Sequence, residues 1–164
     1  MHTRTTTAAA LLLAAGLALT ACSSESHHPG PERVVSTAST TSPTVWDTAA
    51  WKNRVQQLLS QLDPAQAQCT ASPSSDACAN ALRSADTTLL AMKQSLDNSG
   101  QAAKYPATVD LVAKILAGYN AYISDNCPGN PLADEHASQC RTDMATVLLG
   151  VAVLPSKMTA DAAS

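Results

Sequence analysis

Residues 78–96 read CANALRSADTTLLAMKQSL. The apolar side chains of this stretch recur in alternating steps of four and three residues: Cys78, Leu82, Ala85, Leu89, Met92 and Leu96. This period places them on one face of an α-helix. Ser72 and Pro73 suit the start of that helix as its cap and first helical residue. Gly100 suits its end, since glycine readily adopts the left-handed conformation that stops a helix.

The preceding segment predicts a first helix with the same period. Its stripe comprises Trp51, Val55, Leu58, Leu62, Ala65 and Cys69. Thr44 and Asp47, three residues apart, are a plausible capping pair at its start. Pro64 interrupts the stripe, so we expect a kink or a restart at this residue. Trp51 is expected in the core, whereas Trp46 is the freer of the two tryptophans.

A third helix is expected from about Pro106. Its stripe comprises Tyr105, Val109, Val112, Leu116, Tyr119 and Ile123, and it is widened by Leu111, Ile115 and Tyr122. This width predicts that the third helix is the most buried of the set. The sequence Cys127-Pro-Gly-Asn-Pro then ends it.

A fourth helix is expected from about Leu132 to Pro155. Its stripe comprises Ala133, Ala137, Cys140, Met144, Val147, Val151 and Leu154. The acids of Asp134-Glu135-His136 would then complement the dipole of its first turn. Four amphipathic helices with short connections predict an all-α, antiparallel up-down four-helix bundle over residues 44–155. Residues 156–164 are expected to form a loose tail.

Four cysteines fall at the ends of these helices. Cys69 ends the first helix and Cys78 begins the second, whereas Cys127 ends the third and Cys140 lies in the fourth. This order predicts the disulfides Cys69–Cys78 and Cys127–Cys140, both at the end of the bundle opposite its N-terminus. A zinc site would prefer close C-x-x-C pairs, which the chain lacks. His136 and Cys140 also suggest a nucleophile pair, but oxidation would consume the thiol.

The start of the chain has the organisation of an export signal. His2 and Arg4 precede an apolar run from Ala8 to Leu19, which is shorter than the about 20 residues of a membrane-spanning helix. The run ends in Leu19-Thr20-Ala21-Cys22, which resembles the lipobox of bacterial lipoproteins. The resemblance implies that residues 1–21 are a signal peptide and that Cys22 carries a diacylglyceryl group. It also implies anchoring at the outer, extracytoplasmic face of the bacterial membrane.

Residues 22–43 follow as a segment rich in serine, threonine and proline, which predicts a disordered tether. His27 and His28 lie side by side in it without a third ligand, so no metal is expected there. The whole chain has a formal net charge of -3, and removing the leader takes away Arg4 but no acid. This acidic balance argues against nucleic acid as a partner.

The sequence contains none of the serine-hydrolase, zinc-protease, phosphate-loop or S-x-x-K motifs. We therefore expect no enzyme, no catalytic residues and no cofactor. The expected function is a noncatalytic binding or accessory role toward another protein of the cell envelope. Two alternatives are a small-ligand carrier, with Tyr105, Tyr119 and Tyr122 lining an interhelical pocket, and a structural spacer.

Overall fold

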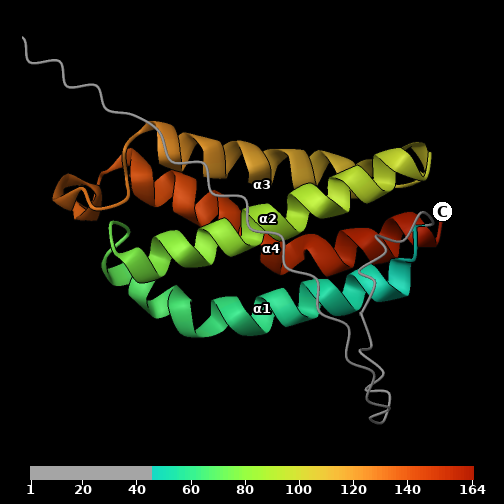
Figure 1. The fold of residues 1–164 in the computed structure, drawn as a ribbon, viewed down its shortest axis with the longest axis horizontal. Helices are drawn as coiled ribbons and strands as arrows, with labels where there is room; N and C mark the ends of the chain where they lie inside the picture. The colour runs from blue at the N-terminus through green and yellow to red at the C-terminus, as the bar shows by residue number, and fades with distance from the viewer. Residues whose placement is uncertain (1–45) are drawn as a thin grey trace, which may run out of the picture. The chain divides into compact units, whose positions relative to one another are not determined.

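A computed structural model describes residues 46–164, which belong to one compact unit. This part of the chain forms α1 (Thr48–Ala71), α2 (Asp76–Asn98), α3 (Pro106–Ser124) and α4 (Gln139–Ala162), with short 3-10 helices η1 (Ala102–Lys104) and η2 (Pro131–Asp134). It contains no strand. The prediction of an all-α, antiparallel up-down four-helix bundle is confirmed (Figure 1). The leader, Cys22, the tether with His27 and His28, and Thr44 lie outside the described residues.

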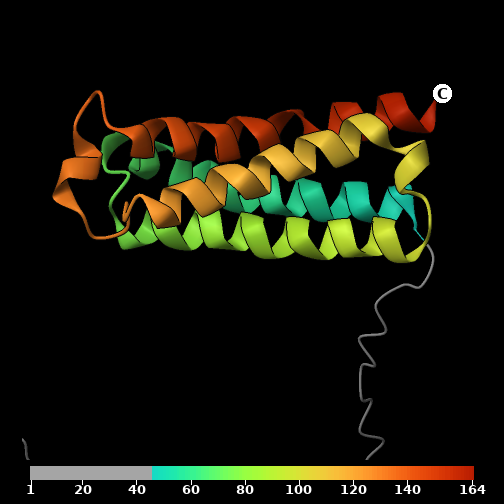
Figure 2. The ribbon, with the colours of Figure 1, turned by 90° about the horizontal axis from the view of Figure 1, so that it is seen from above.

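The four helices run alternately up and down along the bundle (Figure 2). Each helix packs on its neighbours in sequence, α4 also packs on α1, and the α3–α4 contact is the most extensive. The α1–α2 and α3–α4 connections meet at one end of the bundle, as expected. The start of α1, the α2–α3 connection and the end of α4 lie at the opposite end (Figure 1).

The predicted stripes of α1, α2 and α4 form most of the core. Every predicted residue of α2 is buried, as are those of α1 apart from Ala65. In α4 the buried set runs from Cys140 to Leu154 as expected and continues to Met158. The predicted Ala137 is exposed and precedes the helix.

The expected face of α3 is wrong by a small rotation. Ile123 is 41% exposed, whereas Tyr122 and Ile115 are fully or almost fully buried. Val109 and Leu116 are only partly buried. α3 has apolar side chains on both flanks of its stripe, and packing against α2 and α4 selects one of them. It is also not distinctly more buried than α2 or α4.

The helix starts differ from the expected caps. Asp47 caps α1, because its Oδ1 accepts from the N–H groups of Ala49 and Ala50 at 2.9 and 3.1 Å. Ser75 caps α2, so Ser72 ends α1 instead of starting α2. Of the kink or restart expected at Pro64, the restart does not occur, because α1 continues through this residue.

The helix stops follow the local sequence. Gly100 has φ +66°, its N–H donates to Asp97, and the Gln101 N–H donates to Leu96, which is a Schellman motif. α3 ends similarly, with Asn126 at φ 54°. The stop of α3 therefore precedes the proline-containing segment that was expected to cause it.

Two expectations about α4 are wrong. It begins at Gln139, so Asp134-Glu135-His136 is not its first turn. It also continues through Pro155 to Ala162, so residues 156–164 are mainly helical and not a loose tail. The buried side chain of Met158 explains this continuation, because it joins the core beyond Leu154. Within the described range, α4 alone is long and apolar enough to span a membrane, a property that core helices share.

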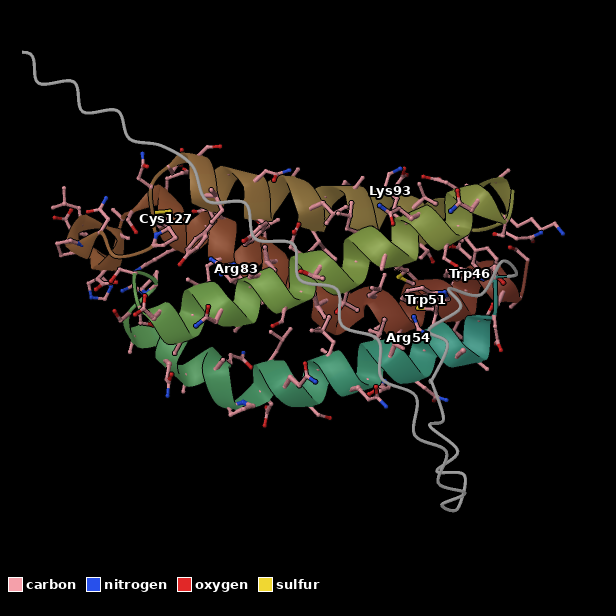
Figure 3. The ribbon with its side chains drawn as sticks, viewed as in Figure 1. Trp46, Trp51, Arg54, Arg83, Lys93 and Cys127 are labelled. Atoms are coloured by element: carbon pink, nitrogen blue, oxygen red, sulfur yellow. A yellow bond between two sulfur atoms is a disulfide. The ribbon has the colours of Figure 1, made fainter. Side chains whose placement is uncertain are left out.

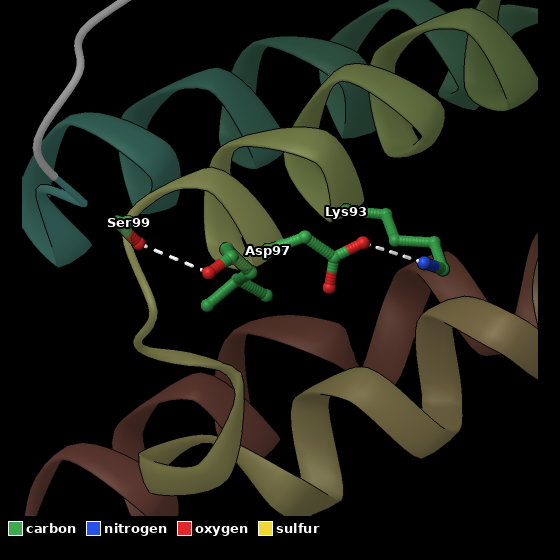
Figure 4. Close-up of polar contacts among 4 residues, drawn as sticks. Lys93, Asp97 and Ser99 are labelled. Atoms are coloured by element: carbon green, nitrogen blue, oxygen red, sulfur yellow. Dashed lines mark hydrogen bonds and ion pairs between the residues drawn. The ribbon is translucent and has the colours of Figure 1, made fainter.

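The described part of the bundle has few ion pairs on its surface. The one ion pair among residues 46–164 joins Lys93 Nζ to Asp97 Oδ2 at 2.7 Å on α2 (Figure 4). The two side chains are 43% and 48% exposed, so the pair contributes only about 0.3–0.5 kcal/mol. Stability of the bundle therefore depends on its core and on the bonds at its ends.

Candidate functional site

The most heavily bonded part of the bundle is the end that holds both disulfides. We call residues 69–78 and 122–141 the disulfide end. The predicted pairs Cys69–Cys78 and Cys127–Cys140 both form, with Cα–Cα distances of 4.8 and 5.6 Å. Each closes one hairpin connection, and all four cysteines are buried. In the chain-entropy description each bond stabilises the fold by roughly 3 kcal/mol.

Asp134 joins the two connections of the disulfide end. Its Oδ1 accepts from the Ser74 N–H at 2.9 Å, and its Oδ2 accepts from the hydroxyls of Ser72 and Ser74, both at 2.9 Å. The Gly129 N–H also donates to the Ser74 carbonyl at 2.8 Å. The hydrogen bonds of Asp134 therefore link the α1–α2 turn to η2.

Arg141 fixes the same region from the start of α4. Its Nη1 donates to the Thr70 carbonyl and its Nη2 to the Asp134 carbonyl, both at 2.6 Å. Its Nε donates to the Glu135 carbonyl at 3.0 Å. The fork of the guanidinium thus ties the end of α1 to the segment that follows η2, which a lysine would not reproduce.

Two side chains here have shifted pKa values. The pKa of Asp134 is lowered, chiefly by the hydrogen bond from the Ser74 backbone, with smaller contributions from both serine hydroxyls and Arg141. Burial raises the pKa of Tyr122 to about 12, with the nearby Tyr119 and Asp134 adding to the effect. At neutral pH Asp134 is therefore an anion and Tyr122 a neutral hydrogen-bond donor.

The disulfide end also presents a large apolar side chain to solvent. Leu132 in η2 is 65% exposed, although its neighbour Ala133 is buried. Its backbone N–H donates to the side chain of Asn130 at 3.1 Å, which helps to hold η2 in place. Among residues 46–164, Leu132 is, with Leu149, the most exposed of the large apolar side chains.

The predicted tyrosine pocket does not form. Tyr122 is fully buried and its Oη donates to the Pro73 carbonyl, whereas Tyr105 bonds to Thr48 at the opposite end of the bundle. Tyr105 borders an open groove of about 480 Å³ with Lys104 and Asp161, and neither other tyrosine lines it. The three tyrosines therefore share no ligand pocket.

The two tryptophans pack together near the start of α1 (Figure 3). Trp51 is 2% exposed, as expected of a core residue, and Trp46 is 8% exposed. Trp46 is thus the more exposed of the two, as expected, but it too is buried. Their ring centroids are 5.9 Å apart with nearly parallel planes, and Tyr105 lies 5.1 Å from Trp46. The sequence did not indicate this cluster, because Tyr105 is distant in the chain.

The structure does not bring His136 and Cys140 together as a nucleophile pair. His136 is exposed and lies outside α4, whereas Cys140 is bonded to Cys127. No group of three or more His, Cys, Asp or Glu side chains suited to a metal ion occurs within residues 46–164. Comparison with known proteins finds no matching family model, no matching curated protein and no matching solved structure.

Proposed function

We propose that this protein is a lipid-anchored, extracytoplasmic lipoprotein of the bacterial cell envelope that binds another protein without catalysing a reaction. The lipobox resemblance at Leu19–Cys22 supports the anchor on Cys22 and the outer face of the membrane. Two disulfides in so small a domain support an oxidising, extracytoplasmic compartment. No nucleic acid partner or cofactor is part of this proposal.

The rigid disulfide end, with Leu132 exposed on it, is the observation that carries the binding role. Association requires little ordering of a surface that is already fixed, so less of the interaction free energy is lost. Here two disulfides and the bonds of Asp134 and Arg141 fix the surface. The proposed tether at residues 22–43 would hold the opposite end of the bundle toward the membrane and present this end to a partner.

The proposal is tested by cross-linking the tagged full chain on intact cells of its source and identifying the captured proteins by mass spectrometry. Leu132→Asp should abolish specific capture. Leu149→Asp is the matched control, because Leu149 is 64% exposed on α4, outside the disulfide end. Binding through this end would be contradicted if both variants lost capture equally. It would also be contradicted if Leu132→Asp captured the partner as well as wild type does.

The anchor is tested separately with Cys22→Ala. This variant should lose the lipid and leave the membrane fraction, and the partner should no longer be captured at the membrane. Fractionation of Cys22→Ala like wild type would contradict the lipoprotein assignment. Absence of any specific partner for the anchored protein would instead favour the structural spacer.

A further inference from the structure

A groove between α1 and α2 lies outside the disulfide end. It has a volume of about 380 Å³ and is lined by Trp51, Arg54, Gln57 and Gln61 of α1 and by Thr87 and Thr88 of α2. Small-molecule sites begin at roughly 300 Å³, so the groove is large enough for one small ligand. Leu58 and Ala91 complete the lining, so the groove offers both apolar and polar contacts.

Arg54 lies over the ring of Trp51 in this groove. The guanidinium Cζ is 4.7 Å from the ring centroid, a cation–π distance. The ring itself is held firmly, because Trp51 Nε1 donates to Ser95 Oγ at 3.2 Å and the ring stacks on Trp46. Arg54 therefore rests on a fixed aromatic surface, which limits the freedom of its side chain.

The hydrogen-bond donors of Arg54 are not used by the rest of the bundle. Within residues 46–164 its guanidinium has no acidic partner, since the ion pair there is Lys93–Asp97. No acidic side chain lines the groove. A guanidinium stacked on an aromatic ring keeps the N–H groups of its edge available for a carboxylate or a phosphate.

The remaining polar groups suit the hydroxyls of the same ligand. Gln57 and Gln61 follow Arg54 at helical spacing, and each offers an amide donor and acceptor. Thr87 Oγ1 donates to the Arg83 carbonyl at 3.0 Å, and Thr88 Oγ1 donates to the Ser84 carbonyl at 2.9 Å. Both threonine oxygens therefore retain lone pairs that can accept from a ligand hydroxyl.

We propose that this groove binds a small hydroxylated oxyanion, a sugar that bears a carboxylate or a phosphate group. Arg54 is the anion-binding residue, and Gln57, Gln61, Thr87 and Thr88 bind the hydroxyls. Charge recognition requires an oxyanion, so a neutral sugar should bind poorly. The site is independent of the disulfide end and does not depend on the proposed protein partner.

The test is titration of the purified full chain with sodium glucuronate, glucose 6-phosphate and glucose. The readouts are calorimetry and intrinsic fluorescence, which reports on the groove because Trp46 and Trp51 are the only tryptophans of the chain. We expect saturable binding of at least one charged sugar with a dissociation constant of about 1 mM or below. The sugar that saturates identifies the carboxylate or the phosphate as the source of the anion.

Arg54→Gln and Arg83→Gln form a matched pair of variants. Arg83 is an exposed arginine of α2 outside the groove lining. Arg54→Gln should weaken binding by about tenfold or more, and Arg83→Gln should leave it unchanged. Far-ultraviolet circular dichroism checks that both variants fold. No saturable binding of either charged sugar, equal binding of glucose, unchanged binding by Arg54→Gln or an equal loss with Arg83→Gln would overturn the proposal.

Discussion

Tyr122 donates a hydrogen bond from its Oη to the carbonyl oxygen of Pro73 at 2.5 Å, linking α3 to the α1–α2 turn. Both residues are buried, so water cannot replace the bond. The two residues are far apart in the sequence, and both belong to the disulfide end. It couples the two hairpins of the bundle, which the disulfides do not, because each disulfide closes a single hairpin.

Removing this hydroxyl should therefore weaken the whole fold. Tyr122→Phe leaves the Pro73 carbonyl buried without a donor, which lowers the free energy of unfolding by about 1–3 kcal/mol. Tyr119→Phe on the same helix is the control, because it also removes the hydroxyl of a buried tyrosine but leaves the Tyr122–Pro73 bond in place. Urea unfolding with the disulfides intact measures both, and equal effects of the two variants would contradict the role of the bond.

Asp134 predicts a loss of stability in acid. Its pKa in the folded protein is below the ordinary value of 3.8, so folding favours the ionised form. The resulting stabilisation is fully present above the unfolded pKa and is lost as the pH falls below 3.8 through the lower folded value. Asp134→Asn should therefore have a lower free energy of unfolding than wild type at pH 7. The difference between the two proteins should become smaller toward pH 3.

Urea midpoints across this pH range measure the effect. Glu135→Gln is the control, since the neighbouring Glu135 is exposed. If the difference in stability between Asp134→Asn and wild type did not change with pH, the charge of the Asp134 carboxylate would not contribute to the stability of the fold.

The close contact of α3 and α4 predicts different tolerances at two glycines. A Cβ on Gly150 would overlap the Ile115 side chain in the core, whereas a Cβ on Gly118 would meet Thr146 Cγ2 at 2.9 Å. Thr146 is exposed and can move, but Ile115 is 1% exposed and cannot. Gly150→Ala should therefore destabilise the fold by about 1–3 kcal/mol, and Gly118→Ala by less.

Thermal unfolding ranks the two alanine variants. A double variant with Ile115→Ala supplies the internal check, because removing the clashing side chain should make Gly150→Ala better tolerated. An equal cost of Gly150→Ala with and without Ile115 would place the cause elsewhere.

Several features of the fold follow from local sequence. Steps of four and three residues locate the core faces of α1, α2 and α4, and the order of the cysteines then predicts both disulfides. The register of α3 does not follow in the same way. Ile123 and Tyr122 are adjacent and both apolar, so only packing against the neighbouring helices decides which one is buried.

The candidate sites depend on contacts that sequence spacing does not reveal. Asp134 is held by serines about 60 residues earlier in the chain, and these bonds keep it in η2 and out of α4. The groove beside Arg54 likewise combines ordinary surface residues of two helices. Neither feature has a local motif, because each is formed by residues that only the packing of the helices brings together.

The last turns of α4 should contribute to stability even though Pro155 suggested that the helix ends there. Asp161 accepts from the backbone N–H groups of Ala107 and Thr108 at 3.3 and 2.7 Å, so α4 caps the start of α3. Met158 is fully buried one turn earlier. We expect Asp161→Ala to lower the free energy of unfolding by about 1 kcal/mol, and Met158→Ala by about 2–5 kcal/mol.

Urea unfolding of these variants and of a chain truncated after Ser156 measures the contribution of the last turns. The truncation removes both contacts and should be more destabilising than Asp161→Ala alone. Lys157→Ala is the control, because Lys157 is exposed between the buried positions. Wild-type stability of the truncated chain would mean that residues 157–164 are dispensable, as a loose tail would be, and that α3 does not need its cap from α4.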